Sequence, residues 1–166
     1  MKKWFFIFLS LPLLFSSCSK SDKCGYAESG ASATTAEITY LQNYLATNSI
    51  IASQHTSGIF YAIVDPGAGS VATVCSNITV NYSGVLLSNG HEFDSDNSAA
   101  GVSFVLGQLI VGWQKGLPII RKGGTIVLYI PPSLGYKSTD RLDQYGAVVI
   151  PANSYLKFTI HLLDVQ

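Results

Sequence analysis

The sequence carries little charge. Only 12% of its 166 residues are charged, and its 10 basic residues are matched by 10 acidic ones. Beyond the lysines at the N-terminus, Arg121 and Lys122 form the only adjacent basic pair. Binding to nucleic-acid phosphates requires a concentrated positive face. The composition therefore excludes a nucleic-acid partner and is typical of one globular domain with an appendage.

Clusters of metal ligands and nucleophile motifs are also missing. His55, His91 and His161 lie far apart, and the sequence has no CxxC pair and no GxSxG. Residues 67–72 match the glycine pattern of a dinucleotide-binding turn, which requires a helix to follow. The β-branched residues of 71–80 predict a strand there instead. We expect no cofactor and no metal.

Long apolar runs are absent except for one at the N-terminus, WFFIFLSLPLLF, which follows Met1, Lys2 and Lys3. About 12 apolar residues suit an export signal and are too few to span a bilayer. Cys18 then follows two serines, which resembles the lipobox of bacterial lipoproteins, although Phe15 departs from it. We expect a signal peptide over 1–17 and a lipidated Cys18 in the cell envelope. Ser19 favours the outer membrane; the alternative is secretion with an unmodified Cys18.

Two further cysteines, Cys24 and Cys75, form an even pair in a chain expected to be exported. Such a pair favours a disulfide, and two free thiols are the alternative. The small polar residues of 18–35 predict a flexible tether between the anchor and the folded part.

The remaining sequence predicts an α+β domain. Thr34 and Glu37 have the spacing of a capping box, and a short amphipathic helix is expected over 36–48, within an N-terminal helical segment of residues 36–57. Alternating apolar residues with turn signals between them then predict strands; they lie at 59–64, 77–87, 91–95, 102–106, 125–130 and 155–165. We expect an antiparallel sheet of five to six strands, curled around one short helix in 110–120. Trp113 would point from that helix into the concave side of the sheet.

Several short motifs occur in one order: VNYSG, FDS, FVLG, QLIVGWQKGL, IPPSLGY, VIPANS and LKFTIHLLDV. In these motifs residues 58–166 resemble the FKBP-type peptidyl-prolyl cis-trans isomerases. The resemblance implies an FKBP-like fold and a shallow aromatic pocket that holds a proline ring. It also implies proline-containing polypeptides as partners, and binding of macrolide inhibitors of this family.

The resemblance also implies the site residues. Trp113 would be the pocket floor, the Tyr136 hydroxyl would meet a substrate carbonyl, and Asp94 would lie beside Tyr82. The implied catalytic residues are Tyr82, Phe93, Asp94, Trp113, Tyr136 and Phe158, and the implied substrate-binding residues are Val102, Leu109, Ile110, Val149 and Ile150.

Two departures from the family pattern leave an alternative open. Val102 stands where many members carry an aromatic wall residue, which should widen the pocket. Lys137 replaces a glycine, and the flap that follows is long and contains Arg141, Asp143 and Tyr145, which could tune the choice of substrate. The alternative is a non-catalytic binding or chaperone module with the same fold.

Overall fold

The computed structural model describes residues 24–166, so the expected signal peptide and Cys18 lie outside the described residues. Two α-helices, α1 (Thr35–Thr47) and α2 (Val111–Gly116), accompany three short 3-10 helices, η1 (Leu106–Gln108), η2 (Leu117–Ile119) and η3 (Pro132–Leu134). The strands are β1 (Ser53–Gln54), β2 (Phe60–Asp65), β3 (Asn77–Leu86), β4 (Glu92–Asp96), β5 (Val102–Val105), β6 (Thr125–Ile130), β7 (Arg141–Leu142), β8 (Val148–Ile150) and β9 (Leu156–Val165). None of the helices in residues 24–166 combines the length and the hydropathy that a membrane span requires.

Seven strands form one sheet in the order β1-β2-β6-β9-β3-β4, and β5 pairs with the first half of β3. Every pairing is antiparallel, which confirms the predicted α+β class. The sheet has one strand more than expected because the two residues of β1 extend its edge beyond β2. The remaining strands, β7 and β8, make a separate hairpin, which is the long flap.

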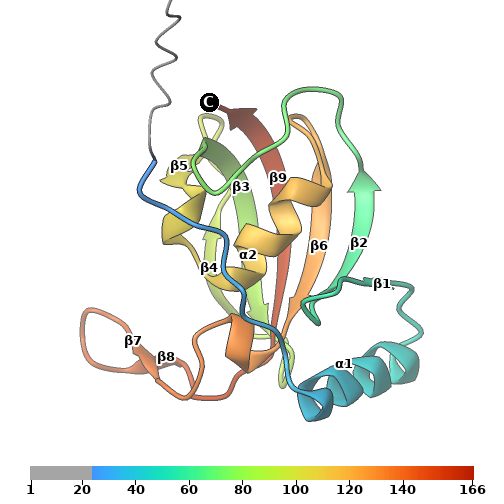
Figure 1. The fold of residues 1–166 in the computed structure, drawn as a ribbon. Coiled ribbons are helices and arrows are strands. Elements are labelled where there is room, and N and C mark those ends of the chain that lie inside the picture. The colour runs from blue at the N-terminus through green and yellow to red at the C-terminus, as the bar shows by residue number, and fades with distance from the viewer. Residues whose placement is uncertain (1–23) are drawn as a thin grey trace, which may run out of the picture.

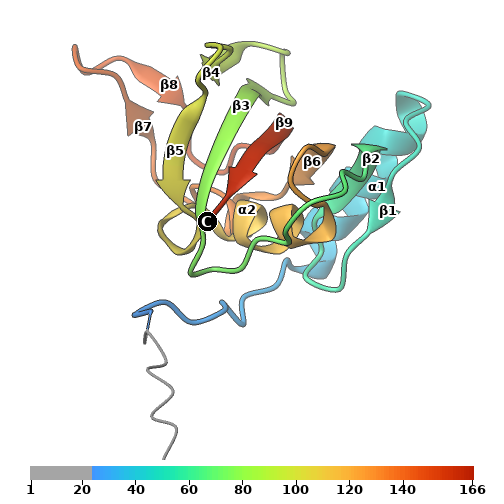
Figure 2. The same ribbon diagram turned by 90° about the horizontal axis from the view of Figure 1, so that it is seen from above.

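Helix α2 lies across the concave face of the sheet (Figures 1 and 2). Side chains alternate between the two faces of a strand, and on β6 Ile126, Leu128 and Ile130 are fully buried in the same core as Trp113. Two glycines allow the helix to approach the sheet this closely. A Cβ atom at Gly112 would lie 2.5 Å from Ile130 Cδ1, and one at Gly116 would lie 2.5 Å from Leu128 Cδ1.

Helix α1 packs on the opposite face of the sheet at one end. Its buried residues Leu41 and Leu45 contact Phe60, Leu87 and Tyr129, which form a second and smaller core. The predicted capping box is confirmed, since Thr34 and Glu37 each satisfy a backbone amide of the other. The first turn of α1 is therefore well defined.

The prediction of a flexible tether through residue 35 is not what the structure shows for residues 24–34. Cys24 is joined to Cys75 by a disulfide, and their Cα atoms are 5.6 Å apart. The Tyr26 hydroxyl accepts a hydrogen bond from Gln108 Nε2 (2.5 Å). Small polar residues suggested a linker, but these contacts hold the segment against the domain. In the chain-entropy model a loop of this length stabilises the fold by about 4 kcal/mol.

The expectation of a strand over 71–80 is correct only for its second half. Val71 makes an isolated bridge with Arg121, and β3 begins at Asn77. Between them Ser76 Oγ accepts a hydrogen bond from the Thr73 amide (3.2 Å) and closes a turn. Local side-chain hydrogen bonds of this kind compete with strand pairing. No helix follows the glycine pattern at 67–72.

Replacing Gly112 by alanine should push α2 away from β6. We expect Gly112→Ala to lower the free energy of unfolding by about 1–3 kcal/mol, the usual cost of overpacking a tight core, as measured by urea titration. Gly30→Ala is the control, because a Cβ atom at Gly30 would meet nothing within 4 Å. Equal stability of the two variants would contradict a close contact between helix and sheet.

Candidate active site

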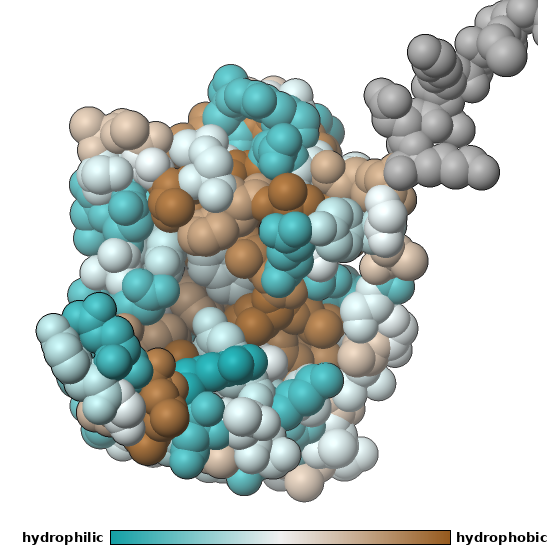
Figure 3. Space-filling view, turned by 90° about the vertical axis from the view of Figure 1, so that its left-hand side faces the viewer, coloured by the Kyte–Doolittle hydropathy of each residue, from teal (hydrophilic) through white to brown (hydrophobic). Residues whose placement is uncertain are grey.

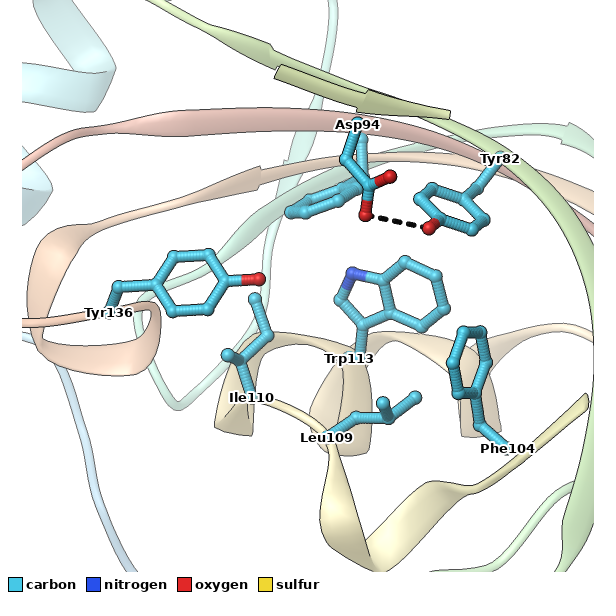
Figure 4. A pocket seen from close by; sticks show the side chains of 8 residues that line it. Tyr82, Asp94, Phe104, Leu109, Ile110, Trp113 and Tyr136 are labelled. Atoms are coloured by element: carbon cyan, nitrogen blue, oxygen red, sulfur yellow. Dashed lines mark hydrogen bonds between the residues drawn. The ribbon is translucent and has the colours of Figure 1, made fainter. Parts of the chain in front are cut away.

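A cavity of about 150 Å³ opens between α2 and the concave face of the sheet (Figure 4). Six aromatic or acidic side chains and two aliphatic ones line it. They come from β3, β4, β5, β9, α2, the segment just before α2 and the turn after η3. These residues are Tyr82, Asp94, Phe104, Leu109, Ile110, Trp113, Tyr136 and Phe158. Because each element contributes only one to three residues, the cavity exists only in the folded domain.

Trp113 forms the floor of this cavity. Its side chain is 4% exposed, and it meets Tyr82 and Phe158 edge to face, with ring centroids 5.4 Å and 5.2 Å away. Edge-to-face pairs of this kind set the orientation of the indole ring as well as burying it. The indole Nε1 is buried and has no hydrogen-bond partner among the described residues. In Figure 4 this atom lies on the side of the indole that faces Asp94 and Tyr136.

The polar edge of the cavity consists of two tyrosines and one carboxylate. The Tyr82 hydroxyl donates to Asp94 Oδ2 at 2.7 Å, and neighbouring strands β3 and β4 hold the pair. Burial, together with the hydrogen bond and charge of Asp94, raises the pKa of Tyr82 above its ordinary value of 10. Burial also raises the pKa of Tyr136, to which the charge of Asp94 contributes. Both hydroxyls therefore stay protonated at neutral pH.

Gly84 allows the back wall to close. A Cβ atom there would lie 2.6 Å from Phe158 Cε1 and 2.7 Å from Phe93 Cζ. Phe93 and Phe158 meet edge to face, with centroids 5.6 Å apart. The glycine of the VNYSG motif is thus required by ring packing rather than by backbone conformation.

A second hollow, of about 470 Å³, adjoins the first and shares Asp94 and Tyr136 with it. Phe93, Val149 and Ile150 supply its apolar side, and Arg141 on the flap supplies a positive charge. The Arg141 guanidinium carbon lies 4.9 Å from the centre of the Tyr136 ring, a cation–π distance. Figure 3 shows this side of the molecule, where apolar side chains gather around a hollow.

The structure brings most of the expected site residues together, in two groups. Tyr82, Asp94, Leu109, Ile110, Trp113, Tyr136 and Phe158 line the Trp113 cavity. Phe93, Val149 and Ile150 line the second hollow, which Asp94 and Tyr136 join. The expectation for Val102 needs correction, because Val102 does not line the cavity.

An aromatic wall residue is nevertheless present. Phe104 lies two residues beyond Val102 on the same face of β5, with its ring centroid 6.4 Å from that of Trp113 and 6.4 Å from that of Tyr82. The period of a strand shows that the two residues share a face. It does not show which of them reaches the helix. The family pattern pointed to Val102, and Phe104 is the residue that lines the cavity.

No group of three or more His, Cys, Asp or Glu side chains within residues 24–166 is placed to hold a metal ion. What the site offers is an apolar cavity with a few polar atoms at one side, an arrangement typical of small-ligand sites. Its chemistry is limited to excluding water, holding a ring and offering hydrogen bonds.

Residues 69–163 match the FKBP-type peptidyl-prolyl cis-trans isomerase family. A relative in Buchnera aphidicola, FKBP-type peptidyl-prolyl cis-trans isomerase FkpA, is 45% identical over 116 residues, which are 69% of this chain and 43% of that protein. The crystal structure of FkpA from Escherichia coli aligns with a TM-score of 0.65 at 34% identity, covering 79% of this chain and 60% of that one. An isomerase structure from Pseudomonas syringae aligns at 25% identity with a TM-score of 0.65, covering 82% and 99%.

Residues 24–166 thus form an α+β domain with an aromatic cavity under its sheet. The chain belongs to the FKBP-type peptidyl-prolyl cis-trans isomerase family. It spans less than half the length of the curated relatives that it matches.

The raised pKa of Tyr82 predicts how stability depends on alkaline pH. A group whose pKa is raised by folding contributes stability that is complete below its unfolded value of 10 and is lost as the pH rises toward the folded value. We expect the free energy of unfolding to fall above pH 10, and to fall less steeply in Tyr82→Phe. Urea titration at a series of pH values measures this slope.

Phe104→Leu is the matched control, because it alters the same cavity without removing a titratable group. It should lower stability equally at every pH. An alkaline slope unchanged by Tyr82→Phe would contradict the assigned environment of that hydroxyl.

Proposed function

We propose that this chain is a peptidyl-prolyl cis-trans isomerase that assists the folding of proline-containing polypeptides in the bacterial cell envelope. The observation that carries the proposal is the largely apolar cavity over Trp113, with polar groups at one side. Its family supports the reaction, and the residues of the cavity support the mechanism that follows.

The reaction needs no nucleophile and no cofactor. An X-Pro amide rotates over a barrier of roughly 18–20 kcal/mol because rotation breaks its resonance, so the uncatalysed change takes tens to hundreds of seconds. Resonance places negative charge on the carbonyl oxygen, and water stabilises that planar form. A cavity of Trp113, Phe104 and Phe158 that excludes water removes this advantage and favours the less polar, twisted amide. Lowering the barrier by about 7 kcal/mol would accelerate the reaction roughly 10⁵-fold.

Two donors remain free for the substrate. Tyr82 already donates its proton to Asp94. Trp113 Nε1 has no hydrogen-bond partner among residues 24–166, and the Tyr136 side chain lines the same cavity. We assign the Tyr136 hydroxyl to a substrate carbonyl and the indole N–H to a second acceptor of the bound prolyl segment. Macrolide inhibitors of the family would occupy the same cavity.

The non-catalytic alternative rested on a wall without an aromatic residue at Val102. Phe104 supplies that ring, so the first argument for the alternative is gone. The long flap remains, but none of its residues lines the Trp113 cavity, and Arg141 lines the neighbouring hollow. We therefore favour catalysis, with the flap acting on the choice of substrate.

We place the protein at the outer membrane, held by acyl chains on Cys18. The support is the sequence alone: a positive N-terminus, about 12 apolar residues and a lipobox-like cysteine. The disulfide between Cys24 and Cys75 agrees with an oxidising compartment.

The isomerase activity is tested on an X-Pro peptide by a protease-coupled assay. We expect the full chain to accelerate the cis-to-trans change, and Trp113→Leu to lower kcat/KM at least about tenfold through the loss of about 1.4 kcal/mol or more of transition-state stabilisation. Circular dichroism should show that the variant stays folded.

Ile51→Ser is the control, because Ile51 is 94% exposed and lies outside both hollows. It should keep full activity. An inactive full chain that still binds unfolded protein would refute catalysis and restore the binding-module alternative.

The lipid anchor is tested by detergent partitioning of the chain expressed in a bacterial host. We expect the full chain to enter the detergent phase and Cys18→Ala to enter the aqueous phase after cleavage, or to remain unprocessed. Cys24→Ala, which breaks the disulfide with Cys75 but leaves the lipobox unchanged, should partition like the wild type. Mass spectrometry showing an unmodified Cys18 would refute the anchor.

A further inference from the structure

Tyr136 is carried by a turn that is strained at its end. The turn follows η3, and the amides of Gly135 and Lys137 both donate to the Pro132 carbonyl, at 3.0 Å and 2.9 Å. Lys137 has a φ angle of 60°, a left-handed conformation that glycine adopts freely and other residues adopt at a cost. Such a residue persists only where the surrounding structure over-determines it. The support for this turn must therefore come from elsewhere in the chain.

Part of that support comes from α1. The Glu37 side chain reaches Ser133, the second residue of η3: Oε1 accepts from the Ser133 amide at 2.8 Å, and Oε2 accepts from the Ser133 hydroxyl at 2.9 Å. The same carboxylate caps its own helix by accepting from the Thr34 amide and hydroxyl at 2.8 Å and 3.0 Å. The Glu37 carboxylate thus links the first turn of α1 to η3, which directly precedes the turn that carries Tyr136. Figure 1 shows the beginning of α1 beside the orange segment that contains η3.

The second attachment comes from the other side of the turn. The Lys137 carbonyl accepts a hydrogen bond from the Asn153 amide at 2.7 Å, just before β9. Ser133 and Lys137 are therefore both fixed, one on each side of Tyr136. Since the Asn153 contact holds only the far end, losing Glu37 would leave the near end held by the packing of Pro132 and Leu134 alone.

The electrostatics of Glu37 agree with this role. Partial burial alone would raise the pKa of Glu37, but its hydrogen bonds with Thr34 and Ser133 outweigh that effect and lower it. The group is therefore an ionised acceptor at neutral pH. Hydrogen bonds to a charged acceptor are roughly twice as strong as neutral ones.

From these contacts we infer that Glu37 is a positioning residue for Tyr136, and that α1 is a brace for the active site. The inference rests on the proposed function, in which the Tyr136 hydroxyl meets the substrate. Glu37 lies outside the part of the chain that matches the family, residues 69–163. The brace is accordingly a contribution of the N-terminal segment to the isomerase domain.

Kinetics of four single variants and one double variant in the full chain test the inference. Glu37→Ala should lower kcat/KM about fivefold, because a small displacement of a catalytic group costs rate. Ser133→Ala, which removes one of the two contacts and leaves the capping box intact, should lose less. In the Tyr136→Phe background, Glu37→Ala should cause no further loss, since interacting residues are not additive. Thr34→Ala is the matched control: it weakens the helix cap and leaves Glu37 on Ser133, so activity should stay at the wild-type level.

Hydrogen exchange supplies a readout that does not depend on catalysis. The amides of Gly135 and Lys137 should exchange at least about tenfold faster in Glu37→Ala than in Thr34→Ala, since exchange follows local opening. If the wild type proves inactive, the proposed function fails while this exchange result still decides the brace. Equal exchange in the two variants, or a full and additive loss of rate in the Tyr136→Phe background, would overturn the inference.

Discussion

The close contact between α2 and the concave face of the sheet is the constraint on which the site depends. Trp113 can serve as a floor only because Gly112 and Gly116 bring the helix backbone against Ile130 and Leu128. With larger residues the helix would stand further away, and the indole would no longer meet Tyr82 and Phe158 edge to face. Six residues of helix would be marginal alone, so α2 takes its stability from this packing. The packing of α2 on the sheet therefore stabilises the helix and also sets the position of the cavity floor.

The cavity also shows a cost that packing alone does not explain. A buried donor without a partner costs about 1–3 kcal/mol, and Trp113 Nε1 is such a donor. The fold accepts this cost beside an ionisable pair, Tyr82 and Asp94, whose own hydrogen bond is satisfied. A prolyl segment that offered an acceptor would recover the lost energy. Buried polar atoms without a partner are rare in packed cores, which agrees with the proposed binding role of this cavity.

Sequence reasoning succeeded where a pattern is local. The strands and α1 follow from alternation and from a capping box, because both are set by neighbours along the chain. The site came from the family resemblance, since its residues meet only across elements far apart in sequence. The errors have the same origin. Val102 and Phe104 share a face of β5, and only the position of α2 decides which one lines the cavity. Residues 24–34 have the composition of a linker, but Cys24 bonds to Cys75 and Tyr26 contacts Gln108, both far along the chain.

These N-terminal contacts also bear on how the domain would sit at a membrane. A tether from residue 18 to residue 35 would allow a span of about 60 Å at full extension. The disulfide attaches the chain to the domain at Cys24, so the span from Cys18 falls to about 20 Å. An anchored domain would then stay within roughly its own diameter of the lipid surface. Polypeptides emerging at the membrane would meet the cavity at high effective concentration, and more distant substrates would have to diffuse to it. The disulfide between Cys24 and Cys75 would thus also keep the cavity close to the lipid surface and favour substrates that emerge there.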